Sequence, residues 1–79
     1  MFSPIDEAID KIIAGNNLAR AEAEAAMEQI LSGNASNAQI AGLLTALSTK
    51  GETVDELVGF ATAMRRHAAV VFSLSLIHI

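Results

Sequence analysis

The chain has 79 residues and a formal net charge of −4, from nine acidic side chains against five Lys and Arg. It therefore lacks the basic surface that binds phosphate backbones, which argues against nucleic-acid binding. It has no cysteine, so disulfides and thiolate metal sites are excluded, and the sequence is compatible with the cytoplasm, where we expect it to reside. A chain this short buries little core, so we also expect a partner surface.

The first ten residues, MFSPIDEAID, carry acids where a secretory signal would have a basic start and an apolar run. We therefore expect a soluble protein with no membrane segment. Three glycines, Gly15, Gly33 and Gly51, then recur every 18 residues, which is roughly the length of a helix plus a turn. This spacing predicts an all-α fold, a small bundle of four helices over about 4–14, 20–32, 37–50 and 54–69.

The first helix is predicted to begin at Ser3 as N-cap, with Pro4 at the first helical position, where its missing N–H costs no hydrogen bond. Apolar residues then recur at helical spacing: Ile5, Ala8, Ile9, Ile12 and Ile13. Gly15 is a natural left-handed stop. The second helix has a similar apolar stripe, made by Ala23, Ala26, Met27, Ile30 and Leu31, and Gly33 closes it.

The third and fourth helices have the clearest start signals. Ser36 with Gln39, and Thr53 with Glu56, have the spacing of a capping box. The third helix is apolar over most of its circumference, because Ala41, Gly42 and Ala46 lie beside its main stripe. That stripe consists of Ile40, Leu43, Leu44 and Leu47. A helix of this kind is buried on more than one side, so we predict that these four residues form an interface with another subunit or domain.

No group of residues predicts catalysis. The carboxylate pairs Asp6/Asp10 and Glu24/Glu28 have a spacing that could hold a metal, but a solvated acidic face is the more common role of such pairs. His67 has no candidate nucleophile and complements the helix dipole. The glycines do not cluster as a phosphate loop requires. We therefore expect no catalytic, substrate-binding or metal-binding residue in this chain, and no cofactor.

Residues 30–68 carry a family resemblance, in the motifs ILSG at 30–33, QIAGLLTAL at 39–47, KGET at 50–53 and AMR at 63–65. In this order and spacing they resemble the N-terminal helical domain of the anthranilate phosphoribosyltransferase family and of the related pyrimidine nucleoside phosphorylases. KGET followed by a helix with AMR is more similar to the former. The second helix departs locally, since Ala19 stands where the family often has a Ser or Thr cap; Asn17 would then cap one turn earlier.

The resemblance implies an enzyme that transfers a phosphoribosyl group from phosphoribosyl pyrophosphate to anthranilate in tryptophan biosynthesis. It also implies a larger α/β domain with a glycine-rich loop and acidic residues for Mg²⁺, motifs that have no counterpart in these 79 residues. We therefore expect this chain alone to be an inactive N-terminal fragment that supplies a homodimer contact and one wall of a hinged cleft. Two alternatives stay open: a fragment of a pyrimidine nucleoside phosphorylase, or a free-standing helical dimerisation module.

The last ten residues, VVFSLSLIHI, begin where the resemblance stops. About twelve apolar residues are too few for a spanning helix, which needs roughly twenty. Residues 74–79, LSLIHI, are what CTG TCT CTT ATA CAC ATC encodes, the transposon end used as a sequencing adapter. We therefore expect residues 70–79 to be an irregular tail outside the helical domain of 1–69, produced by reading into an adapter.

Overall fold

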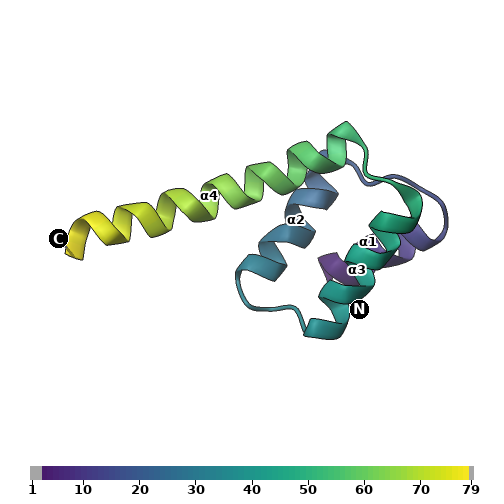
Figure 1. Cartoon of the computed structure of the whole chain (residues 1–79), viewed down its shortest axis with the longest axis horizontal. Helices are drawn as coiled ribbons and strands as arrows, with labels where there is room; N and C mark the ends of the chain where they lie inside the picture. The colour runs from purple at the N-terminus through teal and green to yellow at the C-terminus, as the bar shows by residue number, and fades with distance from the viewer. Residues whose placement is uncertain (1–2, 79) are drawn as a thin grey trace.

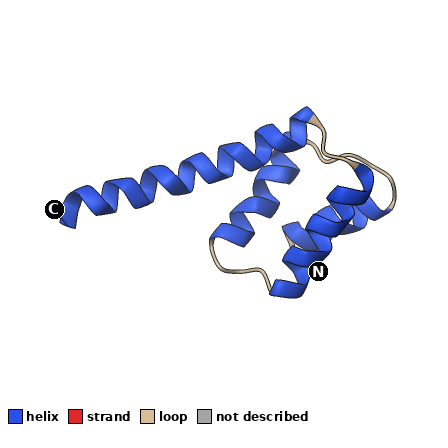
Figure 2. Cartoon of the chain, viewed as in Figure 1, coloured by secondary structure: helices blue, strands red, loops and turns tan. Residues whose placement is uncertain are grey.

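The computed structural model describes the backbone of residues 3–78 and the side chains of residues 3–68. It has four helices: α1 (Pro4–Ile13), α2 (Arg20–Leu31), α3 (Asn37–Lys50) and α4 (Val54–His78). The described residues contain no strand (Figure 2). The predicted all-α fold is therefore confirmed, and the predicted helix starts at 4, 20, 37 and 54 are those of the structure.

The structure differs from the prediction at the end of α4. The sequence predicted that this helix ends near residue 69 and that an irregular tail follows, whereas the backbone stays helical to His78 (Figure 1). The physical reason is that residues 69–78 contain no Gly or Pro to stop the helix, and each added residue then gains one helical hydrogen bond. The side chains of the tail lie outside the described residues, and its origin stays a prediction.

The predicted caps of α1 and α3 are confirmed. Ser3 Oγ accepts the N–H of Asp6 at 3.4 Å, and Ser36 Oγ accepts the N–H of Gln39 at 3.1 Å. The side chain of Gln39 accepts the N–H of Ser36 at 2.8 Å, which completes the capping box. Gly15 and Gly33 lie at φ of +89° and +78°, the left-handed conformation that lets the chain leave α1 and α2 at little steric cost.

The prediction that Asn17 caps α2 was wrong. Ala19 is the N-cap and offers no side-chain acceptor, while Asn17 does not cap the helix and instead accepts a hydrogen bond from Lys50. The carboxylate of Glu22 accepts the N–H of Ala19 at 2.8 Å, so only one half of a capping box is present. Glu22 also pairs with Lys11 of α1 at 2.6 Å, which lowers the pKa of its carboxyl.

The four helices pack in the spatial order α4, α2, α1, α3, with α2 packed on both α4 and α1. The core lies between these elements and is made by apolar side chains of all four helices and the α1–α2 loop: Ile5, Ala8, Ile12, Leu18, Ala23, Ala26, Leu43, Leu47 and Phe60. Core packing is tightest where α4 crosses α2. A Cβ added to Gly59 would lie 2.4 Å from the carbonyl oxygen of Arg20 and 2.7 Å from Ala23 Cβ, so only glycine allows this approach.

In the part of the chain that the structure describes, no helix is both long enough and apolar enough to cross a membrane.

Candidate functional site

A groove between α1 and α3 is the candidate contact surface of this domain. It has a volume of about 710 Å³. Its walls and floor are largely apolar or small, with contributions from both helices: Ile9, Ile12, Ile13, Gly15, Ala41, Gly42, Thr45, Ala46, Thr49 and Lys50. At its floor, a Cβ on Gly42 would lie 3.5 Å from Ile9 Cδ1, so the two helices approach closely without a clash. We call this feature the α1–α3 groove.

The four residues predicted as an interface divide between core and surface. Leu43 is 1% exposed and Leu47 is also buried, and both belong to the core of the chain itself. Ile40 is half-buried, and Leu44 is 58% exposed. That these four residues form an interface stays a prediction. Leu44 is the member that a partner can reach without unfolding of the chain.

Sequence reasoning missed the contribution of α1 to this surface. Ile13 was assigned to the inward stripe of the first helix, yet it is largely exposed, and Ile9 is only half-buried. The width of the apolar stripe could have indicated this. Ile5, Ile9, Ile12 and Ile13 together occupy more of the helix circumference than packing against a single neighbour requires.

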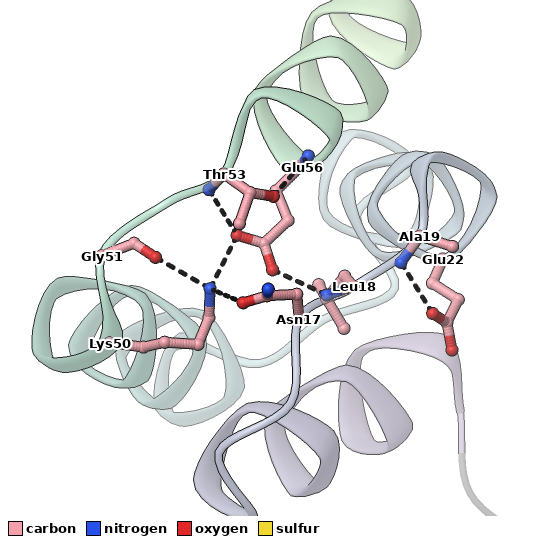
Figure 3. A network of polar contacts seen from close by, with 8 residues as sticks. All are labelled: Asn17, Leu18, Ala19, Glu22, Lys50, Gly51, Thr53 and Glu56. Atoms are coloured by element: carbon pink, nitrogen blue, oxygen red, sulfur yellow. Dashed lines mark hydrogen bonds and ion pairs between the residues drawn. The ribbon is translucent and has the colours of Figure 1, made fainter.

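A buried ion pair, whose Lys50 also lines the α1–α3 groove, joins three segments of the chain (Figure 3). Glu56 of α4 is fully buried, and its carboxylate accepts the ammonium of Lys50 at 2.9 Å. It also accepts the backbone N–H groups of Leu18 at 2.7 Å and Thr53 at 2.8 Å. Thr53 Oγ1 in turn accepts the N–H of Glu56 at 3.2 Å, which confirms the predicted capping box. We call this arrangement the Lys50–Glu56 clamp.

Lys50 completes the clamp from the end of α3. Its ammonium donates to the side-chain oxygen of Asn17 at 2.9 Å and to the carbonyl oxygen of Gly51 at 2.8 Å, in addition to Glu56. The sequence placed Glu56 in a capping box and gave no sign that Glu56 and Lys50 would meet in the interior. The clamp therefore fixes the α1–α2 loop, the end of α3 and the start of α4 against one another.

The clamp keeps Glu56 ionised. Burial by itself would raise the pKa of this carboxyl, but the N–H of Leu18, the ammonium of Lys50 and the N–H of Thr53 together outweigh burial and lower the pKa. A buried carboxylate with this many donors is a structural group, since both of its oxygens accept hydrogen bonds within the protein.

Three of the four carboxylates singled out in the sequence lie beside side chains of the protein: Asp6, Glu24 and Glu28. Glu24 accepts Arg66 NH2 at 2.6 Å, which raises the pKa of Arg66, and Asp6 accepts the side-chain amide of Gln39 at 3.0 Å. His67 Nε2 lies 3.0 Å from Glu28 Oε1, so the two ends of α2 and α4 are joined by side chains. Within the part of the chain that the structure describes, no three His, Asp or Glu side chains come together as a metal site would need.

Comparisons with known proteins give a consistent result. The family model described as the glycosyl transferase family, helical bundle domain, matches residues 6–68. The chain is 55% identical over 69 residues to anthranilate phosphoribosyltransferase of Pelotomaculum thermopropionicum, a match that covers 87% of this chain and 20% of that protein. It is 57% identical over 61 residues to the anthranilate phosphoribosyltransferase of Desulforamulus reducens, covering 77% of this chain and 18% of the relative. The chain thus spans about a fifth of the length of these curated relatives.

Proposed function

Because this chain belongs to the glycosyl transferase family through its helical bundle domain, we propose that it is the N-terminal helical domain of an anthranilate phosphoribosyltransferase. The whole enzyme would transfer a phosphoribosyl group from phosphoribosyl pyrophosphate to anthranilate, in tryptophan biosynthesis and in the cytoplasm. The observation that carries this proposal is the identity of 55–57% with proteins of that name over 60–69 residues. The relatives compared share this name, which favours it over a pyrimidine nucleoside phosphorylase.

The catalytic groups of that enzyme would lie outside these residues. Mg²⁺, which the family implies, does not fit the described carboxylates, because Asp6, Glu24 and Glu56 are each held by side-chain donors of the protein. We therefore assign the metal to the larger domain and derive no step through it. What this chain supplies is shape: two helical layers, fixed by the Lys50–Glu56 clamp, that form one wall of a cleft.

The α1–α3 groove is, in this proposal, the homodimer contact. Ile13 of α1 is exposed and lines the groove next to small residues of α3, whereas Leu44 is exposed on α3 but is not one of the lining residues. Exposed apolar side chains next to small ones let the same surface of a second copy pack closely, with the exposed residues of each copy against the floor of the other. Burial of such a surface would also stabilise a chain too short to form a large core.

The dimer is tested with Leu44→Asp and Ile13→Asp in sedimentation experiments on the 79-residue chain. We expect both variants to weaken self-association at least tenfold while their circular dichroism is unchanged, because both side chains are exposed in the monomer. Leu31→Asp, at the exposed end of α2 and away from the groove, is the matched control. A wild-type chain that sediments as a monomer at high concentration would refute the dimer contact.

The enzymatic proposal is tested with a chimera. Residues 1–69 replace the matched 69-residue segment of the Pelotomaculum thermopropionicum enzyme, and anthranilate phosphoribosyltransferase activity is measured. We expect activity within about tenfold of the parent and no phosphorolysis of pyrimidine nucleosides in the matched control assay. A folded, dimeric chimera without transferase activity would argue for the free-standing dimerisation module instead.

A further inference from the structure

α4 has two apolar faces on opposite sides of the helix. One face carries Gly59, Phe60 and Ala63, which are buried where α4 packs on α2. The other face is open and carries five apolar residues, which we call the α4 stripe: Val54, Leu57, Ala61, Met64 and Ala68. Leu57 is 54% exposed and Met64 is 46% exposed, so the two largest flexible side chains of the stripe reach solvent.

The stripe is continuous and uncharged. At about 100° per residue, its five positions fall within about 80° of the helix circumference, and they span about 21 Å along the axis. Asp55 pairs with Arg20 of α2 and Arg66 pairs with Glu24, whereas Arg65 is exposed and borders the stripe, about 20° around the helix from Val54. A helix that is apolar on two faces is typical of a position between packed elements, and within the described part of the chain α4 packs mainly on α2.

The stripe and the α1–α3 groove are separate surfaces. α4 packs mainly on α2, whereas the groove is lined by residues of α1 and α3 and shares no residue with the stripe. α1 and α3 lie on the other side of α2 from α4 (Figure 1). A second copy seated in the groove through Ile13 would therefore leave the stripe open. The stripe needs an occupant of its own.

We infer that the occupant is an apolar face of the larger part of the enzyme, so that the α4 stripe is the surface on which the catalytic portion docks. This inference rests on the proposed function. The matched family domain ends at residue 68, the last residue of the stripe, and about four-fifths of the relative's own length lies outside the match. α4 is thus the helix nearest to the point where the two parts join, and Leu57 and Met64 are the anchors. Met64, which is unbranched and polarizable, suits a contact that must adjust when a cleft opens and closes.

The test uses the active chimera described above, with Leu57→Glu and Met64→Glu introduced together. In calorimetry the parent chimera should unfold in one transition, because docked parts melt together, whereas the double variant should show two separated transitions. Cleavage by trypsin near the junction that follows residue 68 should become at least tenfold faster. Leu31→Glu, an exposed apolar residue outside both surfaces, should leave the single transition and the cleavage rate unchanged.

Two further measurements separate the possible outcomes. In the 79-residue chain, the double variant should melt within about 2 °C of wild type, which shows that any effect in the chimera is not misfolding of the small domain. A double-variant chimera that unfolds in one transition at the parent temperature overturns the docking inference. So does a double variant whose dimer dissociates while the single transition stays. Loss of transferase activity in the parent chimera bears on the proposed function alone, because docking is read by calorimetry and proteolysis.

Discussion

Removal of the ammonium of Lys50 tests how much the Lys50–Glu56 clamp contributes to stability. In Lys50→Met the aliphatic stem is kept, but the fully buried carboxylate of Glu56 loses its cationic partner at 2.9 Å, the one that the described residues provide. Breaking a buried pair on one side costs about 3–5 kcal/mol. Two backbone N–H groups still donate to Glu56, so we expect a loss near the lower value, about 3 kcal/mol. A 79-residue domain has a free energy of unfolding of about 4–12 kcal/mol, so this loss is large but leaves a measurable folded state.

Glu56→Gln removes the charge from the other side. Glutamine keeps one acceptor oxygen, so its amide nitrogen replaces either the oxygen that accepts from Lys50 and Thr53 or the oxygen that accepts from Leu18. We expect a loss of about 2–4 kcal/mol, since each bond to a charged group contributes about 1.5–3 kcal/mol. In the double variant neither charge is left without its partner, so its loss should be smaller than the sum of the single losses by about 1–3 kcal/mol.

The assay is urea unfolding followed by circular dichroism at the helix band, because the chain has no Trp or Tyr for fluorescence. With a slope of about 1–3 kcal/mol per molar urea, a loss of 3 kcal/mol shifts the midpoint by about 1–3 M. Arg20→Met is the matched control: it breaks an exposed pair with Asp55 and should cost less than about 1 kcal/mol. Single variants within about 0.5 kcal/mol of wild type, or losses that simply add, would refute the claim that Lys50 and Glu56 act as a pair.

Acid gives a second measure of the same clamp. The pKa of Glu56 is lower in the folded chain than in the unfolded chain, so the unfolded state binds the proton more readily and acid favours unfolding. The stabilisation is complete above the ordinary pKa of glutamate, about 4.3, and is lost as the pH falls through the lower folded value. Asp6 and Glu22 also have lowered pKa values, so the quantity to measure is the difference in slope between wild type and Glu56→Gln. Equal slopes below pH 5 would contradict the assignment.

Two helix contacts give further predictions. Gly59→Ala should destabilise the chain by about 2 kcal/mol or more, because the cost of overpacking against the α2 backbone exceeds the gain in helix propensity of about 1 kcal/mol. Gly42→Ala is the control. Its Cβ would lie at an ordinary 3.5 Å from Ile9, so this variant should be neutral or stabilising. Equal urea midpoints for the two variants would show that the α2–α4 crossing can widen freely. Ala19→Ser should stabilise α2 by about 0.5–2 kcal/mol by supplying the missing half of its capping box, whereas Ala38→Ser inside the first turn of α3 should give no gain; a melting temperature unchanged in both would count against the incomplete cap.

Local signals predicted the helices well because the groups that start and stop a helix lie within a few residues of one another. Ser36 with Gln39 and Thr53 with Glu56 have the predicted bonds, and Gly15 has the predicted left-handed conformation. The prediction for Asn17 was wrong for a non-local reason: its side chain is engaged by Lys50, 33 residues away. A sequence pattern that covers one helical turn cannot show that Lys50, so distant in the sequence, donates to the side chain of Asn17.

Burial was less predictable than helicity. Leu43 and Leu44 belong to one apolar stripe, but adjacent residues point about 100° apart, and only the packing of α3 on α1 decides that Leu43 is core and Leu44 is surface. Likewise the sequence showed Gly59 inside a helix, where it normally costs stability, without showing the α2 backbone that makes glycine necessary. These distinctions depend on contacts between helices that no single helix specifies.

The Lys50–Glu56 clamp is related to the two exposed apolar surfaces, the α1–α3 groove and the α4 stripe. In a domain with two exposed apolar surfaces, the apolar side chains on those surfaces do not add to the domain's own core. Contacts other than core packing must therefore help to fix the directions of its helices. The Lys50–Glu56 clamp does this, since it holds the start of α4, the end of α3 and the α1–α2 loop with directional hydrogen bonds. If α4 carries the catalytic portion and α3 the second subunit, as proposed, then the clamp sets the angle between the two contacts. Its loss should therefore misplace the catalytic portion relative to the dimer even in a variant that still folds.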